Sequence, residues 1–214
     1  MAVVVTADII GSRRLLDRGD AQSALDAAIA QVERDLPVAV EGMRPTVGDE
    51  QQAVYPTLEA ALGTILLLRL ALPDGVEFRY GIGVGEVGTV PSTASDRGIS
   101  DGPGWWAARS AIEQVETLQR RTAPQARTWV VAHESTDEVS PDAVRWANAY
   151  LLSRDELVGA MSERTRRLAY GRCLSRTQSE LAASEGITQS AVSQALSSSG
   201  AGSVVEGFRL LELT

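Results

Sequence analysis

The chain has 214 residues, with 28 acidic against 20 basic side chains, which gives a formal net charge of −8. Hydrophobic residues make up 44% and charged residues 22%, values that indicate a globular protein with a real core and exclude a disordered chain. A single cysteine excludes an internal disulfide, and a single histidine excludes a histidine-based triad. The length favours two domains, and the cysteine usage favours a reducing, cytoplasmic location.

No membrane-spanning or targeting segment is expected. The longest apolar stretch, 65–72, is interrupted by Arg69 and is far shorter than the roughly 20 residues that a spanning helix needs. The apolar start of the chain has no basic region before it, so we interpret it as a first strand and not as a signal peptide.

The predicted elements of the first part follow in chain order. Hydrophobic periodicity, glycine and proline positions predict a strand at 2–10, a helix at 20–36, a hairpin of strands at 43–47 and 51–55, a helix at 56–72, a strand at 76–90, a loop at 91–104, a helix at 105–121 and a strand at 127–132. Residues 136–147 are acidic and contain a proline, and we interpret them as surface turns or a linker. This order predicts an α/β (α+β) fold of the ferredoxin-like type, an antiparallel sheet with helices on one face.

The second part is predicted to be helical from residue 150 onward, so we divide the chain into domains at 1–147 and 148–214. The whole excess of negative charge lies in the first 150 residues, and from residue 151 onward seven arginines balance seven acids. This neutrality leaves contact with DNA open.

Two carboxylates are candidate metal ligands. Asp8 ends the first strand and Asp49 lies at the tip of the hairpin, places that are neighbours in a split sheet of this type. Oxygen ligands suit Mg²⁺ or Mn²⁺, and the turn that begins at Gly11 and Ser12 offers backbone N–H groups to phosphates. The alternative is that Asp8 caps a turn and that Asp49 is only a hairpin residue.

Four segments resemble class III nucleotidyl cyclases, in the same order as in that family. They are Ala7-Asp8-Ile9-Ile10-Gly11-Ser12, Thr46-Val47-Gly48-Asp49, Tyr80 to Val87 and Gly104 to Arg109. The resemblance implies metal ligation by Asp8, Asp49 and the carbonyl of Ile9, with Arg109 stabilising charge on the phosphate in the transition state. It also implies a homodimer, because sites of this family are shared between two chains.

The chain departs from that pattern at two positions. Trp105 stands where the family has an asparagine, and Pro45 stands where it has a lysine that reads the base. Arg44 and Asp101 are the candidate substitutes as base contacts. These departures concern activity more than fold.

The C-terminal part has the pattern of a DNA-binding helix-turn-helix. A helix at 178–185, a turn at 186–188 and a helix at 189–197 are expected, with Leu181, Ile187 and Val192 pointing inward. The candidate DNA contacts are short or amide side chains, namely Gln178, Gln189, Ser190, Ser193 and Gln194. A helical hairpin used for protein contacts is the alternative.

Taken over nearly its full length, the sequence resembles the SatD family of bacterial proteins. The leading hypothesis is a ligand-responsive DNA-binding regulator whose cyclase-like domain binds a metal nucleotide, an interpretation that favours binding over catalysis and leaves the enzyme status open. The alternatives are an active nucleotidyl cyclase or nucleotidyltransferase, and an interaction protein with a degenerate site.

Overall fold

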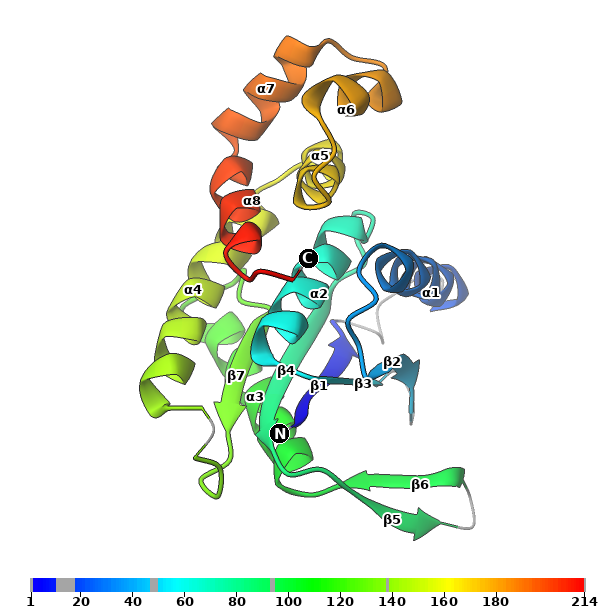
Figure 1. Cartoon of the computed structure of the whole chain (residues 1–214), viewed down its shortest axis with the longest axis vertical. Coiled ribbons are helices and arrows are strands. Elements are labelled where there is room, and N and C mark those ends of the chain that lie inside the picture. The colour runs from blue at the N-terminus through cyan, green and yellow to red at the C-terminus, as the bar shows by residue number, and fades with distance from the viewer. Residues whose placement is uncertain (1, 11–17, 47–49, 93–94, 138, 214) are drawn as a thin grey trace.

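The computed structural model describes residues 2–10, 18–46, 50–92, 95–137 and 139–213 (Figure 1). The strands among these residues are β1 (Ala2–Ile9), β2 (Glu41–Pro45), β3 (Gln51–Tyr55), β4 (Phe78–Gly85), β5 (Gly88–Ser92), β6 (Ser95–Asp101) and β7 (Thr128–Ala132). The helices are α1 (Arg18–Asp35), α2 (Leu58–Ala71), α3 (Pro103–Arg121), α4 (Pro141–Gly159), α5 (Glu163–Cys173), α6 (Gln178–Glu185), α7 (Gln189–Ser198) and α8 (Ala201–Arg209). The mixed α+β class predicted from the sequence is confirmed.

The main sheet has five strands in the order β2-β3-β1-β4-β7, with the apolar strand β1 at its centre. Strand β1 is antiparallel to both β3 and β4, and β2 pairs with β3 as the predicted hairpin. The expectation of a wholly antiparallel sheet is wrong at one edge, because β7 is parallel to β4. The reason is the helix α3 between them, which crosses over the sheet and returns the chain to the end where β4 began.

Helices cover both faces of the sheet, and not one face as expected. Strand β4 alternates glycines with large apolar side chains, so both of its faces are buried. On the glycine face the backbone of α3 lies so close that a Cβ atom on Gly83 would come 2.5 Å from the amide nitrogen of Ala108. The opposite face, which carries Tyr80 and Ile82, packs into the core cluster that includes α2.

Helix α4 replaces the surface turns or linker expected at 136–147. The Ser140 side chain caps the helix by accepting from the Ala143 amide at 3.1 Å, and Pro141 occupies the first turn, where its missing N–H costs nothing. The Asn148 side chain then makes two hydrogen bonds to the backbone of Val130 on β7. The boundary expected at 147/148 therefore falls inside one continuous helix, and the division into two domains stays a prediction.

The connection from β4 to α3 contains a two-stranded hairpin, β5–β6, where the sequence indicated a continued strand and a loop. Figure 1 shows this hairpin projecting from the end of the molecule opposite α6 and α7. One cluster of buried apolar residues runs from the sheet through α2 into α5 and α8, and it includes Ile65, Leu168 and Phe208. No helix in the described ranges is long and apolar enough to cross a membrane.

Candidate functional site

Asp8 lies near the carboxyl end of β1, directly opposite Arg79 in the antiparallel pairing with β4. The Arg79 guanidinium donates to Asp8 Oδ2 at 3.1 Å and to Gln119 Oε1 of α3 at 2.8 Å. The Asp8 side chain is 31% exposed, whereas that of Arg79 is 13% exposed. A ligand that approached Asp8 from solvent would therefore share this carboxylate with a fixed positive charge.

The turn after β1 is described only in its first residue. Ile9, whose carbonyl the resemblance assigns to a metal, is paired with Phe78 on β4, and the Ile10 amide donates to the Glu77 carbonyl at 2.9 Å. Gly11 and Ser12, the candidate phosphate contacts, lie outside the described residues.

The β2–β3 hairpin brings an acidic residue that the sequence interpretation missed. Its ends are closed by the Thr46 amide, which donates to the Glu50 carbonyl at 2.9 Å, while Asp49 lies outside the described residues. The Glu50 carboxylate accepts from Arg109 at 2.7 Å and from the Gln52 amide group at 3.0 Å. An acid directly after Asp49 was a signal in the sequence, but nothing local linked it to an arginine 59 residues away.

Asp8, Glu50, Arg79 and Arg109 form what we call the sheet-end site. Strand β3 starts at Gln51, which is opposite Ala7, so Glu50 and Asp8 belong to the same end of neighbouring strands. Within the described ranges no group of three His, Cys, Asp or Glu side chains is arranged to hold a metal ion. The described donors are carboxylates, which suit a hard divalent cation, and the guanidiniums suit phosphate oxygens.

One candidate base contact lies beside the sheet-end site, because Arg44 pairs in register with Gln52 of β3, whose side chain donates to Glu50. Arg44 is an exposed residue of β2 whose guanidinium pairs with Glu41 at 3.2 Å. Asp101 accepts from the Trp106 indole at 3.0 Å, at the start of α3. There α3 contacts Gly85, so Asp101 belongs to the far end of β4 from Arg79, about 20 Å away along the strand. Asp101 is thus far from Arg79, but its partner Trp106 lies one helical turn before Arg109 of the sheet-end site.

Helices α6 and α7 have the bounds that the sequence predicted to within one residue, and their ends are fixed by local chemistry. Thr177 and Glu180 form a reciprocal capping box at the start of α6, and those hydrogen bonds lower the pKa of Glu180, the Thr177 backbone contributing most. Gly186 ends α6 in the left-handed conformation at φ 65°, and the Thr188 hydroxyl caps α7. This geometry is that of a helix, a tight turn and a second helix.

The outer face of α7 is uncharged and polar. Val192 and Leu196 are buried, and the exposed positions repeat at the spacing of one helical face, namely Gln189, Ser190, Ser193, Gln194 and Ser197. Gln178 and Ser193 line a cavity of about 240 Å³ together with Arg172. The predicted contact residues therefore share one surface.

The arginines around this surface are partly neutralised. Arg167 makes two hydrogen bonds to Glu185, at 2.9 and 2.8 Å, and one to Glu163. The hydrogen bonds from Arg167 lower the pKa of Glu185. Arg176 is exposed beside α6, and Arg172 is partly buried.

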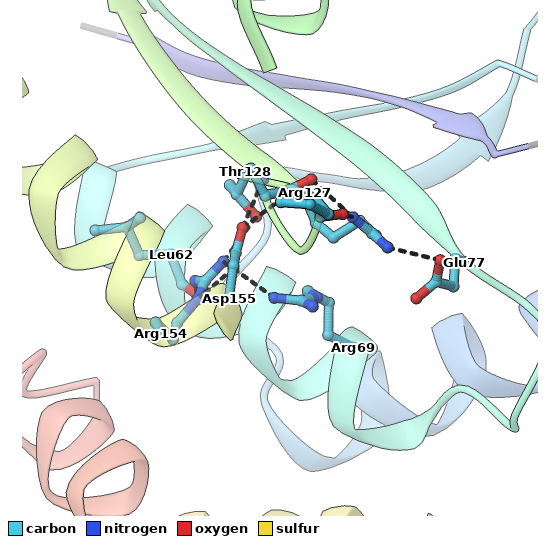
Figure 2. Close-up of polar contacts among 9 residues, drawn as sticks. Leu62, Arg69, Glu77, Arg127, Thr128, Arg154 and Asp155 are labelled. Atoms are coloured by element: carbon cyan, nitrogen blue, oxygen red, sulfur yellow. Dashed lines mark hydrogen bonds and ion pairs between the residues drawn. The ribbon is translucent and has the colours of Figure 1, made fainter. Parts of the chain in front are cut away.

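A buried polar network joins α4 to α2 and to the sheet (Figure 2). Asp155 accepts from Arg69 and Arg154 through one carboxylate oxygen, and from the backbone amides of Arg127 and Thr128 through the other. The side chains of Arg154 and Asp155 are 0% and 1% exposed. Burial lowers the pKa of Arg69, and Asp155 opposes that shift. Sequence reasoning missed this network entirely.

The fold is that of a mixed α+β protein whose five-stranded sheet is followed by a bundle of C-terminal helices. A family model described as the SatD family matches residues 2–205, and the chain belongs to this family. A search of curated proteins found no match.

Several solved structures resemble the chain, and three nucleotidyl cyclases are among them. The guanylyl cyclase Cya2 is 16% identical, with 53% of this chain and 69% of that chain covered and a TM-score of 0.41. A bacterial light-regulated adenylyl cyclase is 18% identical, with coverages of 60% and 42% and a TM-score of 0.42. The adenylyl cyclase CyaB from P. aeruginosa is 15% identical, with coverages of 56% and 81% and a TM-score of 0.39.

Proposed function

We propose that this protein is a ligand-responsive DNA-binding regulator, in which the sheet-end site binds a nucleotide with a divalent metal and α7 contacts DNA. The observation that carries the proposal is the gathering of Asp8, Glu50 and Arg109 at one end of the sheet, carboxylates for a cation beside a guanidinium for phosphate. Asp8 and Asp49 would hold Mg²⁺ or Mn²⁺, which would neutralise the charge of the triphosphate.

The surface of α7 supports the DNA half of the proposal. Its exposed amides and hydroxyls can donate to and accept from base edges, and no acidic side chain lies on α7 to repel phosphates. The N-terminal end of α7 also presents backbone N–H groups toward a phosphate.

Direct contacts connect α5, which precedes the α6–α7 pair, to helices α1 and α2. The Tyr170 hydroxyl of α5 donates to Asp35 at the end of α1 at 2.7 Å, and Arg166 of α5 donates to the carbonyl of Leu72 at the end of α2 at 3.1 Å. Ligand binding that shifted α1 or α2 would therefore act directly on the helix that precedes α6 and α7.

The nucleotide half is tested by calorimetry of ATP and GTP with Mg²⁺ or Mn²⁺ on the wild type and on Asp8→Asn. Asp142→Asn is the matched control, because it removes the same charge from an exposed pair on α4. We expect metal-dependent binding in the wild type and the control, and its loss in Asp8→Asn. If the wild type bound neither nucleotide, the nucleotide half of the proposal would be wrong, and the first part of the chain would have only a structural role.

The DNA half is tested by selection from a pool of random duplexes, with and without the bound nucleotide. The double variant Gln189→Ala and Gln194→Ala is expected to lose the selected sequence, while Gln22→Ala on α1 is expected to keep it. Selection of the same sequences by the double variant would contradict a role of α7 in base recognition.

An active cyclase is the second candidate, and the contact of Arg109 with the acidic hairpin favours it, because nucleotide binding alone does not require that arginine. The same nucleotide mixtures, analysed for cyclic product, separate the two functions. Product formed by the wild type and lost in Arg109→Gln would establish the enzyme and displace the regulator.

A further inference from the structure

A small cavity of about 70 Å³ lies where the end of α2, the start of β4 and the start of α5 meet. Its lining is dominated by charged side chains, three arginines and two acids. We call it the arginine cavity, and its charged residues are Arg69, Asp74, Glu77, Arg127 and Arg166. Phe78 also lines it, whereas the next residue, Arg79, belongs to the sheet-end site, so the two sites lie on opposite faces of β4.

The charges of the arginine cavity are arranged with cations inside and anions outside. The side chains of Arg69, Arg127 and Arg166 are 8%, 7% and 12% exposed. Asp74 and Glu77, by contrast, are 71% and 49% exposed, so water weakens their attraction for the guanidiniums. Behind the cavity, Asp155 is paired with both Arg69 and Arg154 (Figure 2) and so compensates only one of these two charges. The interior keeps an excess of positive charge, in a chain whose net charge is −8.

One buried donor of a lining arginine has no acceptor among the described residues. Arg127 uses Nη1 on the carbonyls of Pro124 and Ala126 and Nη2 on Glu77. Its Nε is buried and has no hydrogen-bond partner among the residues that the structure describes. A buried N–H of a charged group that lacks an acceptor costs free energy, so the charge of Arg127, which lines the cavity, is incompletely compensated.

We propose that the arginine cavity binds a small oxyanion, either inorganic phosphate or the phosphoryl group of a larger molecule. The volume fits, since a single water needs about 10–15 Å³ of such space and a tetrahedral anion with four oxygens needs several times that. This site is separate from the sheet-end site, and the inference does not rest on the proposed function. Because Arg166 belongs to α5, a bound anion would fasten α5 to the start of β4.

The test is calorimetry of the full chain with sodium phosphate and with a nucleoside monophosphate, at constant ionic strength set by chloride. Asp74→Asn removes the exposed acid that holds Arg166 at 2.7 Å, and Glu77→Gln removes the one that holds Arg127 at 2.8 Å. Both substitutions remove an exposed carboxylate that competes for a lining guanidinium, and both leave the core unchanged. The matched control is Asp142→Asn, because Asp142 is also 71% exposed and also pairs with an arginine.

We expect saturable phosphate binding by the wild type that is roughly two- to fivefold tighter in Asp74→Asn and in Glu77→Gln, as the loss of an exposed competing ion pair implies. The control should bind like the wild type, and Arg166→Gln should bind more weakly. Binding of the monophosphate alone would assign the site to the phosphoryl group of a larger ligand. Absence of saturable heat with both ligands, or equal affinities in Asp74→Asn and the control, would overturn the proposal, even if Arg166→Gln fails to fold.

Discussion

Asp155 of α4 and Arg69 of α2 form a buried ion pair across a sequence separation of 86 residues. The same carboxylate also holds Arg154 and the start of β7, so a single acid joins the helical part of the chain to the sheet. Two buried guanidiniums share one carboxylate, and the arrangement is therefore sensitive to any loss of that negative charge.

We predict that Asp155→Asn lowers the free energy of unfolding by about 3–5 kcal/mol, since it leaves two buried guanidiniums without a counter-charge. Urea unfolding followed by circular dichroism measures this difference. Asp142→Asn, on the exposed surface of the same helix, is expected to cost less than about 1 kcal/mol. Equal losses in the two variants would show that the buried carboxylate does not hold the elements together.

The sequence predicted those elements whose causes are local. The bounds of α6 and α7 follow from Thr177, Gly186 and Thr188, which act within a few residues of their own position. The β2–β3 hairpin and the central strand were predicted for the same reason, because their glycines and apolar runs carry the signal themselves.

The features that were missed depend on contacts between distant residues. The parallel pairing of β7 with β4 and the Asp155 network have no local pattern, and Pro141, read as part of a turn or linker, stands in the first turn of α4. Of the sheet-end site, Asp8 and Arg109 were predicted, whereas Glu50 and Arg79 were found only through the strand pairing and the crossing of α3. Asp49 lies outside the described residues and stays a prediction.

The close contact between α3 and β4 gives a second prediction. A methyl group on Gly83 would meet the backbone of α3, which cannot move away without lifting the helix from the sheet. We expect Gly83→Ala to lower the free energy of unfolding by about 1–3 kcal/mol. A methyl group on Gly202 of α8 would make one ordinary contact, with the Leu196 carbonyl at 3.9 Å, so Gly202→Ala should raise the free energy of unfolding by roughly 0.5–1 kcal/mol. Thermal denaturation of both variants checks the opposite signs, and a stabilised Gly83→Ala would rule out the close approach.

The Arg167–Glu185 ion pair predicts that the free energy of unfolding depends on pH. The pKa of Glu185 is lowered from 4.5, so its stabilising contribution is present above that value and is lost as pH falls through the lower value of the folded state. We expect Glu185→Gln to cost up to about 1 kcal/mol near pH 7, and this cost should shrink as the pH falls below 4.5 and through the lowered pKa of the folded state. Urea unfolding across this range measures the difference, with Glu206→Gln as an exposed control. If the loss of stability in Glu185→Gln instead increased as the pH fell, the prediction would be contradicted.

The buried thiol of Cys173 gives the last prediction. It lies in the core cluster, is 5% exposed, and burial raises its pKa to about 12. The thiolate is the form that reacts with iodoacetamide. At about pH 8 the folded protein should therefore be labelled at least 100-fold more slowly than the chain in urea. Labelling of the folded protein should require local opening of α5. Because the chain has one cysteine, mass spectrometry reports this site alone. Asp155→Asn should speed the labelling, since a lower free energy of unfolding raises the population of the open form. Labelling of the folded wild type as fast as the chain in urea would mean that α5 is not packed on the core.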